Sequence, residues 1–235
     1  MKLLKHLIKT PFHPQWFSML RENEGLREMC GSLSGLVLDI GCAERKPRAF
    51  LPGDAEYLGL DYFDTATEWY GTRPDVFGDA RQLPFGTASV DHVLLMDVLE
   101  HIPEPDACLG EIHRVLKPGG TLSMQIPFMY PVHDDPLDFH RWTRSGLQRA
   151  AARAGFEIRM EKALGHPLET AALGANIGVS KSCLNWVTGR NPLMVLALGL
   201  PFFVLFTNIL AWLAARLSRD DDMMPYAYRT IWVKS

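Results

Sequence analysis

A short buried strand that ends in a glycine turn constrains the fold of this chain more than any other feature. Residues 37–40 form an apolar run that lies between Gly35 and Gly41, as expected of a buried parallel strand. A second such run ends at Asp61, about 20 residues after the turn, where a carboxylate can accept hydrogen bonds from a ribose diol. The pattern predicts a doubly wound α/β domain that binds an adenosine-containing cofactor.

The residues of the turn distinguish between cofactors. A dinucleotide dehydrogenase carries glycines in the pattern G-x-G-x-x-G, whereas only Gly41 fits that pattern here and Glu44 would repel a pyrophosphate. A nicotinamide-dependent oxidoreductase is therefore disfavoured. Asp39 places a carboxylate in the turn, which suits the sulfonium and ammonium charges of S-adenosylmethionine. The alternative is an ordinary strand and turn with a buried aspartate.

Several motifs follow one another over residues 36–158. They are D-I-G-C at 39–42, G-L-D at 59–61, G-D-A-x-x-L-P-F at 78–85, L-E-H-I-P-x-P at 99–105 and R-V-L-K-P-G-G at 114–120. Each motif alone is weak, but their order and spacing together are specific. The series resembles the class I S-adenosylmethionine-dependent methyltransferases, in particular the methyltransferase type 11 family.

The resemblance implies a role for each cofactor-binding position. The implied residues line the methionine part (Asp39, Gly41, Ala43), the ribose and adenosine (Asp61, Tyr62), the adenine (Asp79, Ala80) and the transferring methyl group (Met96, Asp97). The chain departs from the family at Ala43, where glycine is usual. Alanine adds a single methyl group at this point of close approach, and we expect cofactor binding to survive it.

The resemblance also implies the fold, a Rossmann-like methyltransferase fold with a doubly wound, mostly parallel seven-stranded sheet. Residues 156–160 are expected to form the sixth strand, after a helix over 143–154, and residues 227–233 the seventh. In this fold the seventh strand inserts antiparallel between the fifth and the sixth. We therefore divide the chain into an N-terminal helical segment (1–34), a methyltransferase domain (35–161 and 226–235) and a hydrophobic helical insertion (162–225).

Charge and cysteine usage exclude some classes of partner. The formal net charge is −3, which argues against a nucleic-acid partner because such a partner requires a clustered basic face. Four cysteines lie far apart with no C-x-x-C pair, a pattern that suits a reducing compartment and gives no zinc site. We expect a cytoplasmic protein with no metal, and its oligomeric state stays open.

The C-terminal third contains an unusually apolar stretch. Residues 193–215 carry no charge, and as a straight helix they would be about 34 Å long, enough to span a bilayer. Because the seventh strand must return to the sheet, a single crossing is excluded. We expect a helical hairpin that breaks near Gly199 and Pro201, with arms over 193–200 and 202–217 that contact the membrane. The alternative is an insertion buried against the domain or in a dimer interface.

The N-terminus supports membrane contact weakly. Residues 1–9 place leucines and an isoleucine on one helical face and lysines on the other, which is typical of a helix on an anionic membrane surface. We therefore expect a peripheral or monotopic protein on the cytoplasmic face of the membrane. An ordinary terminal helix is the alternative.

The loop after the fifth strand holds the candidate catalytic residues, because ligands of α/β sheets bind at the carboxyl ends of the strands. His133 and His140 lie in this loop and either could take a proton from an acceptor hydroxyl. His101 is a third candidate, as a base or as a structural histidine. A divalent metal held by His133, Asp134, Asp138 and His140 is disfavoured, since their spacing is not that of a tight ligand set.

These observations favour one function and leave an alternative. The favoured function is an S-adenosylmethionine-dependent methyltransferase that acts at the membrane surface on a small or lipid-linked acceptor, such as a glycolipid precursor or a quinone-like lipid. The alternative is a non-catalytic adenosyl-binding scaffold protein of a membrane complex, suggested by Ala43 and by the absence of a clear base in the sequence. The acceptor and the methylated atom stay open.

Overall fold

A computed structural model describes residues 9–235, which form two compact units. The sheet unit contains Glu24–Phe128, Val132–Lys162 and Ala227–Ser235. Of the described residues, the hairpin unit contains 9–23, Met129–Pro131 and Ala163–Tyr226. The amphipathic helix predicted over residues 1–9 lies almost wholly outside the described residues.

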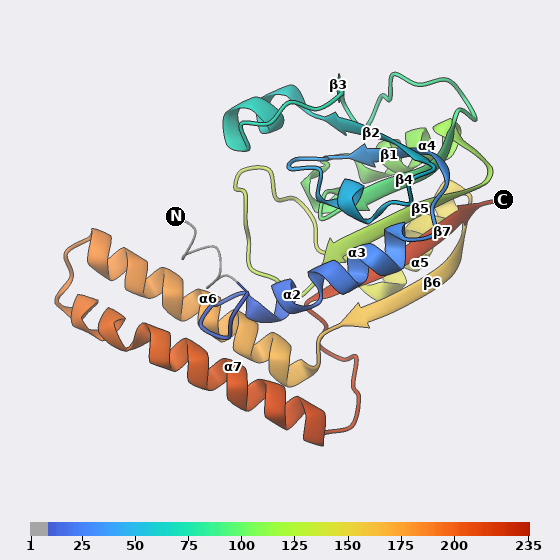
Figure 1. Cartoon of the computed structure of the whole chain (residues 1–235). Coiled ribbons are helices and arrows are strands. Elements are labelled where there is room, and N and C mark those ends of the chain that lie inside the picture. Colours follow the sequence, from blue (N-terminus) through green and yellow to red (C-terminus); the bar gives the residue numbers. More distant parts are fainter. Residues whose placement is uncertain (1–8) are drawn as a thin grey trace. The chain divides into compact units, whose positions relative to one another are not determined.

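The sheet unit is built on a seven-stranded sheet with the order β3-β2-β1-β4-β5-β7-β6. Its strands are β1 (Gly35–Ile40), β2 (Ala55–Asp61), β3 (Val76–Phe77), β4 (Val90–Met96), β5 (Leu116–Pro127), β6 (Phe156–Leu164) and β7 (Ala227–Lys234). The neighbouring strands β3-β2, β2-β1, β1-β4 and β4-β5 pair in parallel. Strand β7 pairs with β5 in the antiparallel direction. The predicted mostly parallel seven-stranded sheet is confirmed, including the place of its last strand (Figure 1).

Helices cover both faces of this sheet. Figure 1 shows α3 (Glu22–Cys30) in front of the sheet and α4 (Pro105–Val115) and α5 (Arg144–Ala154) behind it. The apolar side chains of α3, among them Leu26 and Met29, pack against β1 and β4. Burial of such apolar stripes on both faces is what stabilises a parallel sheet.

Local signals set the ends of α5. Thr143 caps its start, because its hydroxyl oxygen accepts a hydrogen bond from the Gly146 amide at 3.1 Å. Gly155 ends the helix with φ of 82°, a left-handed conformation that glycine adopts without strain. The helix predicted over residues 143–154 is confirmed.

The parallel strands bring their carboxyl ends to one edge of the sheet. Asp61 at the end of β2 lies opposite Phe77 of β3, and Met96 at the end of β4 lies opposite Gln125 of β5. The glycine turn after β1 opens at the same edge. The candidate site is therefore built from several loops on one rigid scaffold.

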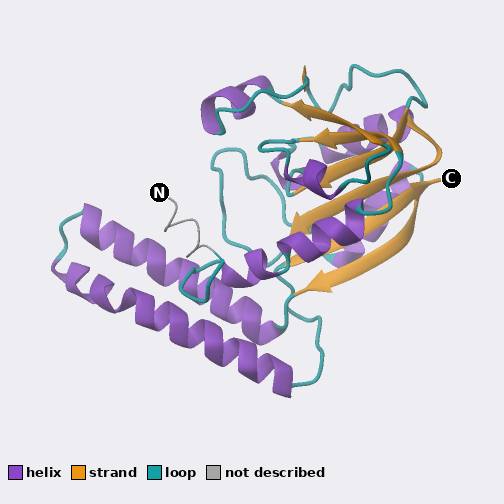
Figure 2. Cartoon of the chain, in the orientation of Figure 1, coloured by secondary structure: helices purple, strands orange, loops and turns teal. Residues whose placement is uncertain are grey.

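The hairpin unit consists mainly of helices, which are α2 (Trp16–Leu20), α6 (Pro167–Thr188), η4 (Pro192–Gly199) and α7 (Leu200–Leu217) (Figure 2). Figure 1 shows α6 running antiparallel beside η4 and α7. Of the described residues, Pro192–Leu217 is a 26-residue helical stretch that is long and apolar enough to cross a membrane.

The predicted position of the hairpin turn is wrong. The chain reverses at residues 189–191, where Arg190 has φ of 52°, and not at Gly199 and Pro201. Pro201 stands in the first turn of α7, where its missing N–H would have had no helical partner. The apolar stretch is therefore one arm of the hairpin, and α6 is the other.

Buried amides join the two arms. Asn176 of α6 donates to the Asn208 side-chain oxygen of α7 at 2.8 Å, and both side chains are fully buried. Thr207 donates to Asn176 at 2.6 Å. Asn208 also donates to the carbonyl oxygens of Pro11 at 2.8 Å and His13 at 3.1 Å. These bonds satisfy polar groups inside an apolar packing and fix how the arms pair.

Replacing Asn208 by alanine is expected to lower the free energy of unfolding by about 2–4 kcal/mol, because the change leaves several buried polar groups unpaired. Thermal unfolding in detergent measures the loss. Asn185→Ala, at an exposed position of α6, is the matched control and should leave the midpoint nearly unchanged. Equal midpoints for the two variants would contradict the role of the buried amides.

Candidate active site

The first turn after β1 requires a glycine. Gly41 has φ of 69°, and a Cβ atom there would lie 2.5 Å from Cγ2 of Val98. The Gly41 amide donates to the carbonyl oxygen of Leu60 at 2.8 Å, so the turn is tied to the end of β2. The Val98 side chain thus fills the space that a side chain at position 41 would need, and only glycine fits this turn without strain.

Asp61 connects this turn to the second strand. Its carboxylate accepts hydrogen bonds from the Ala43 amide at 2.9 Å and from the Tyr62 amide at 2.8 Å. Burial raises the pKa of Asp61 above its usual range. Each carboxylate oxygen has two lone pairs, so both can still accept a bond from a ribose hydroxyl. The structure thereby brings together three of the residues assigned to the cofactor.

Asp39 is a buried acid in β1. The Tyr57 hydroxyl donates to its carboxylate at 2.6 Å. Burial, with a smaller contribution from the neighbouring Asp61, raises the pKa of Asp39 to about 7, although the hydrogen bond from Tyr57 lowers it. A cation beside Asp39 would favour the ionised form, which is what the ammonium group of an amino-acid cofactor supplies.

The affinity for S-adenosylhomocysteine is expected to rise about tenfold between pH 5.5 and pH 7. The pKa of Asp39 is about 7, so the carboxyl group is mostly protonated at pH 5.5. That proton must leave before the carboxylate can pair with the ligand's ammonium group. Calorimetric titration at several pH values measures the trend. Asp39→Asn should bind with a flat pH profile, and a wild-type profile that is equally flat would contradict this role.

Ala43 has φ of 38°, in the left-handed region. This conformation costs an alanine about 1–2 kcal/mol, whereas glycine adopts it freely. The observation gives a physical reason for the glycine that the family resemblance implies at this position. The extra methyl group is nevertheless accommodated in the turn.

Asp79 and Ala80 follow the short strand β3. Arg81 holds the Asp79 carboxylate in a forked ion pair, with its Nη2 2.7 Å from Oδ2, and this pair lowers the pKa of Asp79. Ala80 is buried. The Gly78 amide donates to the carbonyl oxygen of Asp61 at 3.0 Å, which keeps this segment beside the end of β2. Contact of Asp79 and Ala80 with adenine stays a prediction.

Met96 and Asp97 lie at the tip of β4. The Met96 side chain packs against the apolar cluster between α3 and the sheet. Asp97 adopts a left-handed conformation with φ of 53°, held by two bonds to Gln125. Its amide donates to the Gln125 carbonyl oxygen, and its carboxylate accepts from the Gln125 side chain, each at 2.8 Å. Non-glycine residues in this conformation concentrate at functional sites.

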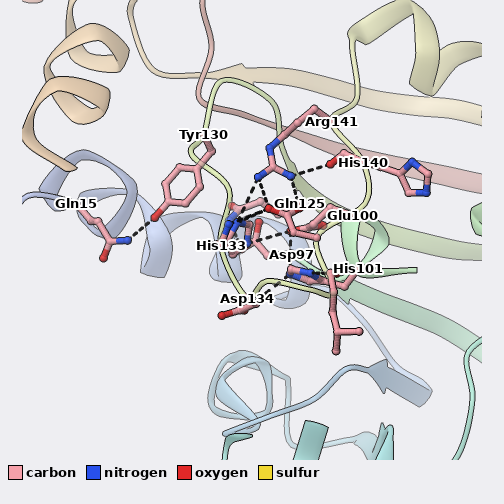
Figure 3. Close-up of polar contacts among 12 residues, drawn as sticks. Gln15, Asp97, Glu100, His101, Gln125, Tyr130, His133, Asp134, His140 and Arg141 are labelled. Atoms are coloured by element: carbon pink, nitrogen blue, oxygen red, sulfur yellow. Dashed lines mark hydrogen bonds and ion pairs between the residues drawn. The ribbon is translucent and has the colours of Figure 1, made fainter. Parts of the chain in front are cut away.

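The loop after β5 brings two of the three candidate histidines together. The rings of His101 and His133 meet edge to face with centroids 4.9 Å apart. The His140 ring instead lies against Trp142, with centroids 5.8 Å apart. Figure 3 shows the His140 ring pointing away from the other two. A direct part for His140 in proton transfer is therefore not favoured by its placement.

Arg141 braces this loop. Its guanidinium pairs with both oxygens of Asp138, at 2.5 and 2.6 Å, which holds the pKa of Asp138 down at about 2. The same carboxylate accepts a hydrogen bond from the His133 amide at 2.9 Å. Asp138 thus sets the position of His133 in the loop.

Glu100 is a residue of this site that the sequence analysis missed. Its side chain is fully buried, and burial together with Asp97 raises its pKa to about 9. Its Oε1 lies 3.7 Å from Nε2 of His101 and 3.8 Å from Nε2 of His133. The L-E-H motif after the fourth strand was the available signal, but the motif alone does not show that the later loop folds back onto it.

Comparison with known proteins shows similarity to methyltransferases over part of this chain. A model described as a methyltransferase domain matches residues 38–124. A probable S-adenosylmethionine-dependent methyltransferase of Mycolicibacterium smegmatis is 32% identical, over 61% of this chain and 60% of its own length. A sterol 24-C-methyltransferase of Neurospora crassa is 34% identical, over 48% of this chain and 33% of its length. A fatty-acid O-methyltransferase of M. smegmatis is 33% identical, over 54% and 50%.

The chain thus spans between one third and three fifths of the length of these relatives. A solved S-adenosylmethionine-dependent methyltransferase from Thermotoga maritima has a TM-score of 0.57 at 15% identity, and the match covers 100% of this chain and 95% of that one. At such low identity the likeness concerns the fold. With the turn, the acid at the end of β2 and the strand order in place, residues 38–124 of this chain match a methyltransferase domain, and the chain is similar to S-adenosylmethionine-dependent methyltransferases of class I.

Proposed function

We propose that the protein transfers the methyl group of S-adenosylmethionine to a lipid-linked or other amphipathic acceptor while it lies on the cytoplasmic face of a membrane. The observation that carries the proposal is the exposed apolar surface of α7 in a chain with a methyltransferase domain. Relatives that methylate sterols and fatty acids support an acceptor of lipid character.

The exposed surface of α7 is a stripe of large apolar side chains, which we call the apolar stripe: Phe202, Phe206, Leu210, Leu213 and Leu217. Phe202 is 73% exposed and Phe206 is 66% exposed. The residues recur at intervals of three or four, so they share one face of the helix. Exposed patches of this kind in proteins mark sites of contact with a partner or a membrane.

The opposite face of α7 is already used inside the hairpin unit. Val204, Asn208 and Ala211 are buried there, and α6 lies along that side. A helix of an ordinary soluble domain would present polar residues on its other face. Since α7 is apolar on both sides, its free face suits a hydrocarbon environment.

Charges along the hairpin favour an orientation in the plane of the membrane. Arg190 lies at the turn, and Arg216 lies at the far end of α7, where its guanidinium stacks over Trp212 at 3.6 Å from the ring centroid. Lys181 is exposed on α6 between these ends. A flat hairpin keeps all three cations near anionic headgroups, whereas a spanning one would place Lys181 within the bilayer.

The chain's own residues would carry out the reaction by binding and positioning. Bound S-adenosylmethionine supplies an activated methyl group. Asp39 and Asp61 would hold its ammonium group and its ribose. The cluster of Glu100, His101 and His133 lies beyond the tip of β4, where it would meet the acceptor. Correct placement of the acceptor atom in line with the methyl group supplies most of the rate enhancement in such a transfer.

A methyl-transfer assay tests the proposal. The purified protein is incubated with methyl-labelled S-adenosylmethionine and either a lipid extract of membranes or a water-soluble extract. We expect label in the organic phase with the lipid extract. Label only in water-soluble products would remove the lipid acceptor, and S-adenosylhomocysteine binding without any transfer would favour the adenosyl-binding scaffold.

A further inference from the structure

We infer that Glu100, His101 and His133 bind one divalent metal ion, which would hold the oxygen of a hydroxyl acceptor. The inference rests on the proposed function only for the identity of the acceptor, because metal binding can be measured by itself. It replaces the expectation of a metal-free protein, which rested on the scattered cysteines and on the spacing of residues in the later loop.

The three side chains present their donor atoms to a common point. The nearest nitrogen and oxygen atoms of the three residues all lie within 4.8 Å of one another. Figure 3 shows Glu100, His101 and His133 gathered in one place, with ion-pair lines joining the carboxylate to both rings. Ligand atoms about 2.1 Å from one ion lie about 3.0–3.5 Å apart. The two carboxylate-to-ring distances, 3.7 and 3.8 Å, are within about 1 Å of that geometry, and atoms 4.8 Å apart would have to close by about 1.3–1.8 Å.

The histidine rings are oriented as metal ligands are. Nδ1 of His101 lies 2.8 Å from the carbonyl oxygen of Leu137, and because a carbonyl only accepts, this nitrogen carries the proton. Nε2 of His101 then offers its lone pair to the cluster. His133 turns Nε2 toward Glu100, and its Nδ1 lies 3.3 Å from the Asp138 carboxylate and 3.4 Å from Nη2 of Arg141. A carbonyl or carboxylate behind each ring is the usual support of a ligating histidine.

The burial of Glu100 without a hydrogen bond is a second observation that points to a ligand. Its side chain is 0% exposed, and neither carboxylate oxygen has a hydrogen-bond partner among the described residues. Buried polar groups in proteins are almost always satisfied, and buried charges are paired or bind metals. A carboxylate that is aimed between two imidazole nitrogens and lacks hydrogen bonds fits a metal ligand better than a structural role.

The ligand set limits the kind of ion. Two imidazoles and one carboxylate suit first-row ions such as Mn²⁺, Fe²⁺ and Zn²⁺ more than Ca²⁺ or Mg²⁺, which prefer oxygen ligands. Three protein ligands leave coordination positions for other donors. Oδ2 of Asp134 lies 4.0 Å from Nε2 of His101, close to these positions, and the acceptor oxygen could occupy another.

A metal here would select a hydroxyl acceptor. Binding to the ion lowers the pKa of the hydroxyl, so that its proton passes to solvent water. The oxygen then forms a bond to the methyl carbon as the bond from that carbon to sulfur breaks, which releases S-adenosylhomocysteine. The imidazoles bind the ion and do not accept the proton.

Metal titration of the purified protein tests the site. The protein is stripped with a chelator, dialysed and titrated with Mn²⁺ under electron paramagnetic resonance, and with Zn²⁺ by calorimetry. We expect one saturable site, and a loss of affinity of at least about tenfold in Glu100→Gln and in His133→Gln. His92→Gln is the matched control, because His92 lies on β4 and bonds to Thr121 at 2.7 Å. Binding of S-adenosylhomocysteine by each variant shows that it is folded.

Each outcome bears on the inference. No saturable binding of either ion by the wild type, or equal affinity in Glu100→Gln, His133→Gln and the wild type, would overturn it. Methyl transfer that continues unchanged after chelation would also overturn it and leave the proposed function standing. Metal binding without any methyl transfer would instead count against the proposed function alone.

Discussion

Replacing Asp61 by alanine is expected to weaken S-adenosylhomocysteine binding by about 10²- to 10⁴-fold. Two charge-assisted hydrogen bonds to the ribose would be lost, each worth about 1.5–3 kcal/mol, and each 1.4 kcal/mol is about tenfold in affinity. The variant also leaves the amides of Ala43 and Tyr62 without the carboxylate that they bond in the structure. Calorimetry or equilibrium dialysis measures the loss.

The control for this variant is Asp91→Ala. Asp91 lies in β4 and plays a similar structural part, since its carboxylate accepts the Leu36 amide at 2.9 Å and pairs with Lys117 at 2.8 Å. It stands near the amino end of the strand, away from the edge that forms the site. Equal losses of affinity in the two variants would mean that Asp61 supports the fold and does not contact the ligand.

The double change Phe202→Asp with Phe206→Asp is expected to release the protein from membranes. Each carboxylate costs up to about 2.5–3.5 kcal/mol in an apolar membrane environment, so the pair can abolish binding. Both side chains are exposed and lie on the face of α7 opposite the buried Asn208, so the hairpin should stay folded. Flotation with vesicles that contain anionic lipid measures membrane binding, and S-adenosylhomocysteine affinity should be unchanged.

Leu20→Asp with Met223→Asp adds the same charge at exposed apolar positions outside the apolar stripe. This control should float like the wild type. A wild-type protein that stays at the bottom of the gradient while it forms dimers would assign the apolar stripe to contact between two copies. Release by the control as well would show that net charge, and not the apolar stripe, governs binding.

The sheet and the cofactor turn could be predicted because their signals are local or carried by spaced motifs. Gly41 and Asp61 each end an apolar run, and the length of chain between them is that of a single crossover. The place of β7 came from the resemblance, since nothing local in residues 227–233 says which strands it joins. The cap at Thr143 is likewise visible in sequence.

The hairpin could be predicted only in part. The apolar content of α7 is evident, but α6 contains glycines and polar residues and shows no strong periodicity. The hydrogen bond between Asn176 and Asn208 joins positions far apart in sequence. No local sequence pattern predicts that these two side chains pair. Pro201 suggested a break because a proline inside a helix is disruptive, whereas its actual place in the first turn makes it harmless.

The acceptor side of the site was the least predictable. His133 and His140 look equivalent in sequence, yet the Asp138 brace turns one toward Glu100 while the other ring lies against Trp142. Glu100 could be read as one more helical acid, because its burial depends on a loop that follows more than thirty residues later. Contacts between residues far apart in the sequence set the direction of side chains in long loops. Such contacts cannot be predicted from a single sequence.

The order of the strands has a consequence for biosynthesis. β7 lies between β5 and β6, but it leaves the ribosome only after both arms of the hairpin. Until then β5 and β6 cannot be joined by their common neighbour, and the sheet keeps open edges of the kind that invite wrong pairing. The hairpin is therefore available to a membrane before the domain that carries the cofactor site can be completed. Under the proposed function, a nascent chain would meet the lipid surface first and become able to bind S-adenosylmethionine there.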